Sequence, residues 1–232
     1  FLYNQLHQCG VYDEGSASYR KYEYNTVKAG TSYESFEIRH SNIAQQSFDG
    51  YLSISYNTFE KGRVYMYDMN IYDNATASIH VNNNTFGSGS YGIYLSYLQN
   101  YTNETDNLDI SILNNTIDGI HNGNSYSGYG ASLSLSQKGA KVRFENNQIS
   151  AVNRGLYIYS AHNISNATIN NNSVDSASYV GFYLDKVSGT IESNTLSYCS
   201  RENNAIEIKS DFNSPSINTL QYNTITGSGY AL

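Results

Sequence analysis

Three charged residues towards the end of the chain have the chemical types that glycoside hydrolysis requires. Asp185 and Glu207 are carboxylic acids, and Lys209 follows Glu207 by two positions. A glycosidase uses two carboxyl groups about 5 to 9 Å apart, one of them as the acid. These residues could do acid/base chemistry if the fold places positions 185 and 207 on adjacent strands. A surface ion pair would use the same residues.

Tyrosine is the other residue type that stands out, with 24 tyrosines and no tryptophan among 232 residues. A flat ring with a polar hydroxyl group suits the binding of a sugar or of a protein partner. The alternative is that stacked tyrosines only stabilise a sheet as cross-strand neighbours. The candidate ligand-binding tyrosines are Tyr65, Tyr67, Tyr94, Tyr157, Tyr159 and Tyr183.

Metal-ligand patterns are weak in this sequence. Histidines are scattered without ligand spacing, at His7, His40, His80, His121 and His162. The segment 104–109 holds three carboxylates that could bind calcium, but it lacks the spacing of an EF-hand loop and also fits a solvated loop. We therefore expect neither a metal nor a cofactor.

The elements that must position these residues come from a short repeat. It consists of an apolar residue, two arbitrary residues, Asn, a polar residue and an apolar residue, and a period of roughly 20 to 50 residues indicates a solenoid. Its eight copies centre on Asn25, Asn57, Asn84, Asn115, Asn147, Asn172, Asn194 and Asn223.

Apolar and polar residues alternate before each repeat Asn, which is typical of a half-buried strand. Asn tolerates positive φ, so we expect it to form the corner between two strands and to stack with its equivalents in a ladder. No stretch of ten residues has a helical stripe. Each coil should therefore hold three strands that pair in parallel with those of the next coil.

The third strand of each coil has two apolar positions with an outward residue between them. The predicted copies are 36–38, 64–66, 93–95, 133–135, 156–158, 182–184 and 206–208, and three of them follow a Gly. This register makes the tyrosines above point outwards, with Ser134 and Ser136 in the coil that follows Tyr94. It predicts exposed rings at Tyr94, Tyr157 and Tyr183. The predicted buried side chains include Ile112, Leu135, Phe144, Ile158, Ile169 and Leu184.

The pattern resembles the right-handed parallel β-helix repeat of pectin-lyase-like enzymes and NosD-like proteins. The resemblance implies an all-β solenoid of about eight coils, with residues 1–232 as a single domain. In pectin-lyase-like enzymes the third-strand face binds polysaccharide. The paired Asp and Gly-His-Gly phrases of polygalacturonases are absent, as is a pectate-lyase-like set of calcium ligands with a catalytic Arg. We therefore do not expect catalysis.

Charge and hydropathy narrow the range of partners. The net charge of −7 argues against nucleic acid and anionic membranes. No apolar run approaches the ~18 residues of a membrane span. The chain begins at Phe1 and stops within a coil near Leu232, so we expect a segment of a longer protein or of a filament of stacked copies. Its partners would then be other copies or further domains.

The two cysteines, Cys9 and Cys199, lie in coils separated by roughly 30 Å if coils stack at about 4.8 Å. A disulfide needs Cα atoms about 5.5 Å apart, so the two should not bond to each other.

Eight sequons offer sites for N-glycosylation. Three of them directly precede a repeat Asn, where a side chain should point outwards. We expect at least one to be modified, although unmodified polar corners would look the same. The sequons start at Asn74, Asn83, Asn100, Asn103, Asn114, Asn163, Asn166 and Asn171.

These patterns favour an extracellular or cell-surface structural or adhesive rod that binds a glycan or a protein partner through its tyrosines. The alternative is a polysaccharide lyase or glycoside hydrolase of the pectin-lyase-like class. A glycan-binding module without catalytic activity lies between the two.

Overall fold

The structure, a computed structural model, describes residues 2–7, 10–14, 19–28, 36–44, 49–71, 75–90, 92–100, 108–119, 128–135, 140–160, 164–200, 204–210 and 217–228. At positions 7, 40–44, 88–90, 97–100 and 165 it describes the backbone alone. In these ranges all regular secondary structure is strand. No helix in them is long and apolar enough to cross a membrane.

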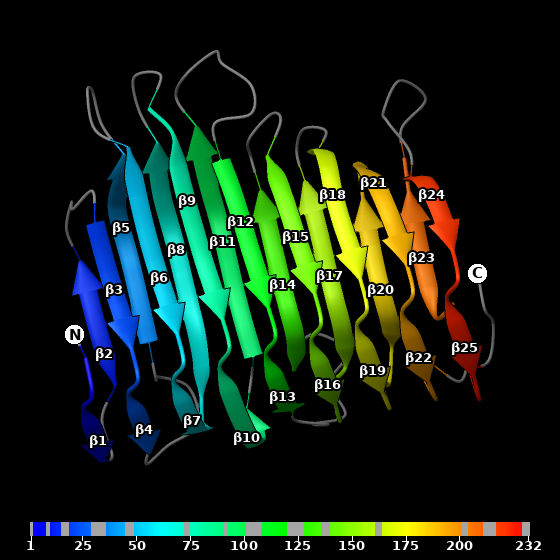
Figure 1. Cartoon of the computed structure of the whole chain (residues 1–232), viewed down its shortest axis with the longest axis horizontal. Coiled ribbons are helices and arrows are strands. Elements are labelled where there is room, and N and C mark those ends of the chain that lie inside the picture. Colours follow the sequence, from blue (N-terminus) through cyan, green and yellow to red (C-terminus); the bar gives the residue numbers. More distant parts are fainter. Residues whose placement is uncertain are drawn as a thin grey trace.

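Three parallel sheets run along the molecule, and each coil adds one strand to each sheet (Figure 1). The nine-stranded sheet, called sheet 1, contains β1 (Gln5–His7), β4 (Thr26–Lys28), β7 (Thr58–Lys61), β10 (Thr85–Ser90), β13 (Thr116–Gly119), β16 (Gln148–Ser150), β19 (Ser173–Asp175), β22 (Thr195–Ser197) and β25 (Thr224–Thr226). The three sheets together form a right-handed parallel β-helix. The repeat predicted the parallel solenoid, and the family resemblance implied its right-handedness.

The other two sheets have eight strands each. Sheet 2 contains β2 (Val11–Glu14), β5 (Phe36–Ala44), β8 (Arg63–Ile71), β11 (Gly92–Asn100), β14 (Tyr129–Leu135), β17 (Arg154–Ser160), β20 (Val180–Asp185) and β23 (Ile206–Lys209). Sheet 3 contains β3 (Tyr19–Glu23), β6 (Gly50–Ser55), β9 (Ala77–Asn82), β12 (Leu108–Leu113), β15 (Lys141–Glu145), β18 (Ile164–Asn170), β21 (Val187–Glu192) and β24 (Ile217–Gln221).

The inward stripe of each coil forms one continuous core. All six side chains predicted to be buried are at most 1% exposed. Burying a side chain of this size contributes roughly 1.5–3 kcal/mol. Phe59 and Phe86 stack at 4.6 Å between ring centroids, and Phe36 meets Phe59 edge-on at 5.4 Å. The alternation of period two therefore assigned the inner and outer faces correctly.

The predicted asparagine ladder is present and is longer than expected. Each amide oxygen accepts two hydrogen bonds from the Asn of the preceding coil, as when Asn115 donates its backbone N–H and its Nδ2 to Asn147, both at 3.0 Å. Nδ2 of Asn147 also donates to the carbonyl of Ile112 at 2.9 Å. Asn4 donates to Asn25 in the same way, so it adds a ninth member that the predicted eight copies omit.

The predicted backbone of the corner is wrong in one respect. Positive φ falls on the residue before each ladder Asn, with φ between 54° and 58° in all nine coils. We call these the outer corner residues, because their side chains leave the coil where the ladder Asn turns inwards. They are Tyr3, Tyr24, Tyr56, Asn83, Asn114, Asn146, Asn171, Ser193 and Tyr222.

The outer corners also carry three of the predicted glycosylation sites. Asn114 and Asn171 are exposed and Asn83 is half-buried, while Asn166 is exposed on β18. Whether any of them carries a glycan stays a prediction. The remaining sequon side chains, at Asn74, Asn100, Asn103 and Asn163, lie outside the described residues, as do the side chains of His7 and His40. The same holds for Cys9, His121, His162 and positions 104–107 of the calcium candidate.

Candidate functional site

The candidate binding face is the outer surface of sheet 2. The parallel pairing places Tyr65 opposite Tyr94, and Tyr157 opposite Tyr183. These rings point outwards because the flanking residues, such as Leu156 and Ile158, are fully buried in the core. The strand pattern thus brings together the predicted tyrosines of adjacent coils.

The register of one coil differs from the prediction. Tyr94 lies opposite Ser132, and Leu95 lies opposite Leu133, so the outward residues on β14 are Ser132 and Ser134 instead of Ser134 and Ser136. Gly130 occupies the place that Gly92, Gly155 and Gly181 hold, directly ahead of the first inward apolar residue of each strand. Aligning the copies on this Gly would have given the correct register.

The same strand supplies a tyrosine that sequence reasoning missed. The ring of Tyr129 meets Tyr94 edge-on at 5.2 Å and Tyr157 at 5.6 Å, so it fills the gap above Ser132. Tyr65 and Tyr94 lie 6.5 Å apart, and Tyr157 and Tyr183 stack at 4.6 Å. These five rings form an unbroken line across β8, β11, β14, β17 and β20, and we call them the tyrosine row.

Cationic side chains lie between the rings of the tyrosine row. The guanidinium of Arg63 lies 4.3 Å from the ring centroid of Tyr65 and 5.7 Å from that of Tyr94. Arg154 lies 5.3 Å from Tyr129 and 5.0 Å from Tyr157, and it donates to the Tyr129 hydroxyl. Cation–π contacts contribute about 0.5–1 kcal/mol at exposed sites and about 2 kcal/mol where the cation is desolvated, as it is at the buried Arg154. They hold the rings in fixed orientations.

The rings of the row are less exposed than the sequence predicts. Tyr94, Tyr157 and Tyr183 are half-buried, because each ring is covered on one side by its neighbour in the next coil. Burial raises the pKa of Tyr65, Tyr94 and Tyr157 above the ordinary value of 10.0. The phenols of these three residues are therefore neutral hydrogen-bonding groups at physiological pH.

The remaining two candidate tyrosines lie beside the row on the same sheet. Tyr67 lies 6.0 Å from Tyr65, and Tyr159 is 47% exposed. The two belong to the second outward position of their strands, as predicted, and Tyr159 lies opposite Ser134. They widen the aromatic surface on one side.

The acid/base candidates lie at the C-terminal end of sheet 2. Asp185 is opposite Lys209, and Tyr183 is opposite Glu207. The Lys209 ammonium binds Glu207 at 3.1 Å and lies 5.0 Å from the Tyr183 ring. The hydrogen bond to Glu207 raises the pKa of Lys209. What the geometry shows here is an ion pair on a half-exposed surface.

No group of three His, Cys, Asp or Glu side chains that could hold a metal occurs in the described ranges. Cys199 is a free, fully buried thiol. Comparison with known proteins found no matching family model, no matching curated protein and no matching solved structure.

Proposed function

We propose that this protein is a non-catalytic, extracellular or cell-surface β-helical rod that binds a polysaccharide through its tyrosine row. One observation carries the proposal: five consecutive coils each place one outward ring in the same line. Such a line extends in one direction, as a polymer does.

The spacing of the row suits an extended sugar chain. Neighbouring strands lie about 4.8 Å apart, so the coils would meet successive units of a chain laid along the rod. The uncovered part of each ring offers an apolar surface for sugar C–H groups, and its hydroxyl offers a group for hydrogen bonding. The contacts of Arg63 and Arg154 hold the rings before a ligand arrives, which lowers the entropy lost on binding.

The exposed sequons at Asn114 and Asn171 support an extracellular location. Glycosylation acts on secreted and surface proteins, and both side chains point away from the coil. Protein isolated from its native source should lose mass on treatment with peptide N-glycosidase. An unchanged mass would remove this support.

The binding test uses the whole chain and immobilised neutral polysaccharides, namely cellulose, chitin and mannan. We expect at least one of them to retain the protein, and the double substitution Tyr157→Ala with Tyr183→Ala to weaken that retention about tenfold or more. Tyr198→Ala is the matched control, because Tyr198 is 67% exposed and lies outside sheet 2. Retention unaffected by the double substitution, or absent for all three polysaccharides, would overturn the proposal.

A further inference from the structure

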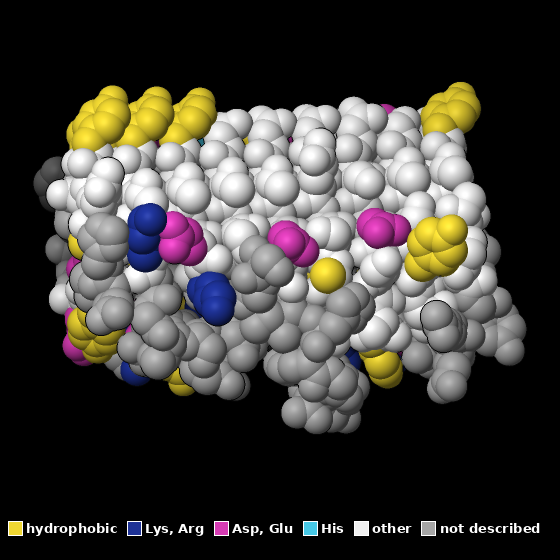
Figure 2. All heavy atoms as spheres, turned by 90° about the horizontal axis from the view of Figure 1, so that it is seen from below, with side chains coloured by type: hydrophobic (Ala, Val, Ile, Leu, Met, Phe, Trp, Pro, Cys, Tyr) yellow, Lys and Arg dark blue, Asp and Glu magenta, His cyan; other side chains and the backbone are white. Residues whose placement is uncertain are grey.

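A second aromatic surface lies at the N-terminal end, away from the tyrosine row. The outer corner residues Tyr3, Tyr24 and Tyr56 stack on one another, with centroids 5.0 and 4.9 Å apart and planes within 9° of parallel. They are 74%, 44% and 50% exposed. We call them the corner stack. Figure 2, which looks onto sheet 1, shows hydrophobic side chains gathered along one edge at this end.

The three tyrosines of the corner stack have a backbone conformation that is unfavourable for bulky residues. All three have φ of 54° to 58°, a conformation that bulky side chains rarely adopt and that Asn and Gly adopt more readily. The next four coils have Asn at the same position. Three consecutive bulky side chains in this conformation suggest that the rings serve a purpose beyond folding.

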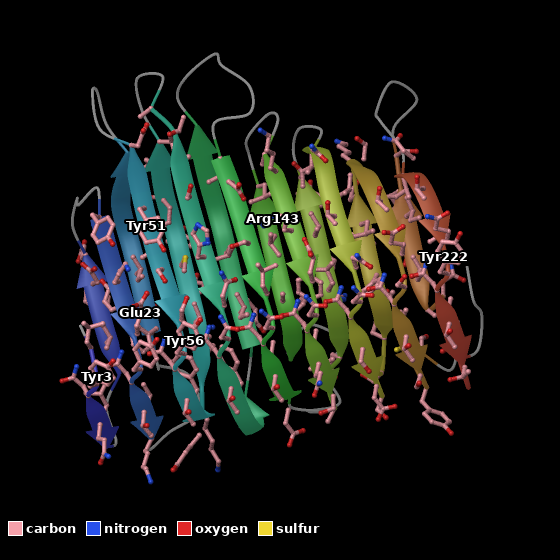
Figure 3. The ribbon with its side chains drawn as sticks, viewed as in Figure 1. Tyr3, Glu23, Tyr51, Tyr56, Arg143 and Tyr222 are labelled. Carbon is pink, nitrogen blue, oxygen red and sulfur yellow. The ribbon has the colours of Figure 1, made fainter. Side chains whose placement is uncertain are left out.

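A second stack runs parallel to the first on the outer face of sheet 3. Tyr19 and Tyr51 lie 5.2 Å apart, and His80 lies 5.2 Å from Tyr51. Figure 3 shows Tyr51 and Tyr56 on either side of the position of Glu23. The two stacks thus flank a strip of the sheet that crosses β3 and β6.

The strip between the stacks is made of short or charged polar side chains. Ser53 and Ser55 point outwards but are at most 5% exposed, because taller neighbours cover them. Ser53 donates to Glu23 at 3.1 Å and shares a hydrogen bond of 2.9 Å with Ser55. Lys21 lies 3.8 Å from the same carboxylate. The serines therefore form a covered, hydrogen-bonded floor, and the accessible polar groups between the aromatic walls are Lys21 and Glu23.

We propose that the two stacks and this strip form a second carbohydrate-binding site, which takes a short stretch of a neutral sugar chain. In each stack the ring faces cover one another, so a ligand meets ring edges and phenol hydroxyls. Ring edges carry positive partial charge and attract the oxygen atoms of a ligand. Glu23 accepts hydrogen bonds, so the ligand must also donate them. Polyhydroxylated molecules meet both requirements.

The charges of the strip disfavour a strongly charged ligand. Glu23 repels an anion, and Lys21, which faces it and lies 5.7 Å from the Tyr19 ring, repels a cation. The pair leaves the strip neutral overall. This site lies on sheet 3 and the adjoining corner, so it does not depend on the tyrosine row of sheet 2.

The chain contains no tryptophan, so a single introduced tryptophan reports on one site alone. Tyr56→Trp is titrated with neutral hexasaccharides of glucose, mannose and N-acetylglucosamine, and we expect a saturable change in emission with at least one of them. Tyr222→Trp is the matched control: it has the same corner conformation at the other end of the rod, beside Ser193, and should not respond. Adding Glu23→Gln should weaken the Tyr56→Trp response about tenfold.

Hydrogen exchange of the unmodified chain gives an independent measurement, since the bound sugar should protect amides of β3 and β6. A Tyr56→Trp emission that no sugar changes, together with unaltered exchange, would overturn this site. So would equal responses from positions 56 and 222. Tyr183→Trp reports separately on the tyrosine row, so failure of one site is distinguishable from failure of the other.

Discussion

Two adjacent positions at the same corner of every coil follow opposite rules. The inner position is Asn in all nine coils, whereas the outer position is Tyr in four coils, Asn in four and Ser in one. In the seven coils between the two ends the inner Asn is at most 1% exposed and its amide bonds to both neighbouring coils, as at Asn147. The outer residue must only accept positive φ. The fold therefore dictates the inner residue and leaves the outer one open to function.

The largest expected loss of stability comes from replacing the Asn at the inner position. Asn147→Leu leaves both Asn115 donors and the Ile112 carbonyl without the side-chain amide that now bonds to them. The Asn172 oxygen keeps the hydrogen bond from the backbone N–H of residue 147 and loses only the one from Nδ2. Leaving buried polar groups unpaired costs about 1–3 kcal/mol, so the free energy of unfolding in urea should fall by that amount. Asn166→Leu, at an exposed position on sheet 3, should change it by less than about 0.5 kcal/mol. Equal effects would contradict the distinction.

The outer position should respond to backbone conformation alone. At Asn146 φ is 57°, so Asn146→Val forces a β-branched residue into a left-handed conformation and should cost about 1–2 kcal/mol. Asn146→Gly should match the wild type to within about 0.5 kcal/mol, because Gly adopts this conformation without strain. The two variants are compared by thermal melting. If valine is tolerated as well as glycine, conformation does not govern this position.

A smaller effect on stability is expected from the buried thiol of Cys199 in the last coils, and it depends on pH. Burial raises the pKa of the Cys199 thiol from 9.0 to about 11. Below pH 9 the thiol is protonated in both states; above it only the unfolded thiol ionises, so stability falls as pH rises from 9 to 11. At pH 10 the loss is about 1 kcal/mol. Cys199→Ala should show a shallower decline over this range, and an identical slope would contradict the assignment.

The sequence predicted the core and the ladder because both repeat with the coil. Alternation of period two separates Ile112 and Phe144 from their outward neighbours, and burial follows from that alternation. The repeat analysis did not include Asn4, because the copy that contains it begins at the first residue of the chain. The positive φ was assigned to the wrong residue because Asn fills both corner positions in several coils, and composition alone could not separate them.

The aromatic surfaces were harder to predict because they depend on lateral register between coils of unequal length. Tyr129 joins the tyrosine row from a position before the aligned strand, and the row predicted from the repeat omitted it. Tyr24 and Tyr56 looked like arbitrary residues within the repeat. Only the stacking of neighbouring coils shows that they meet Tyr3 in one stack. A single strand carries no signal for such contacts.

The most direct test converts the N-terminal corner into that of the central coils. Tyr24→Asn with Tyr56→Asn removes the stacked rings and supplies the residue that four other coils already use at this position. Loss of ring stacking and relief of backbone strain oppose each other, so the melting temperature should change little. Calorimetric titration with the sugar that acts on Tyr56→Trp should then show binding at this corner in the wild type and none in the double variant. Undiminished binding by a folded double variant would contradict the account.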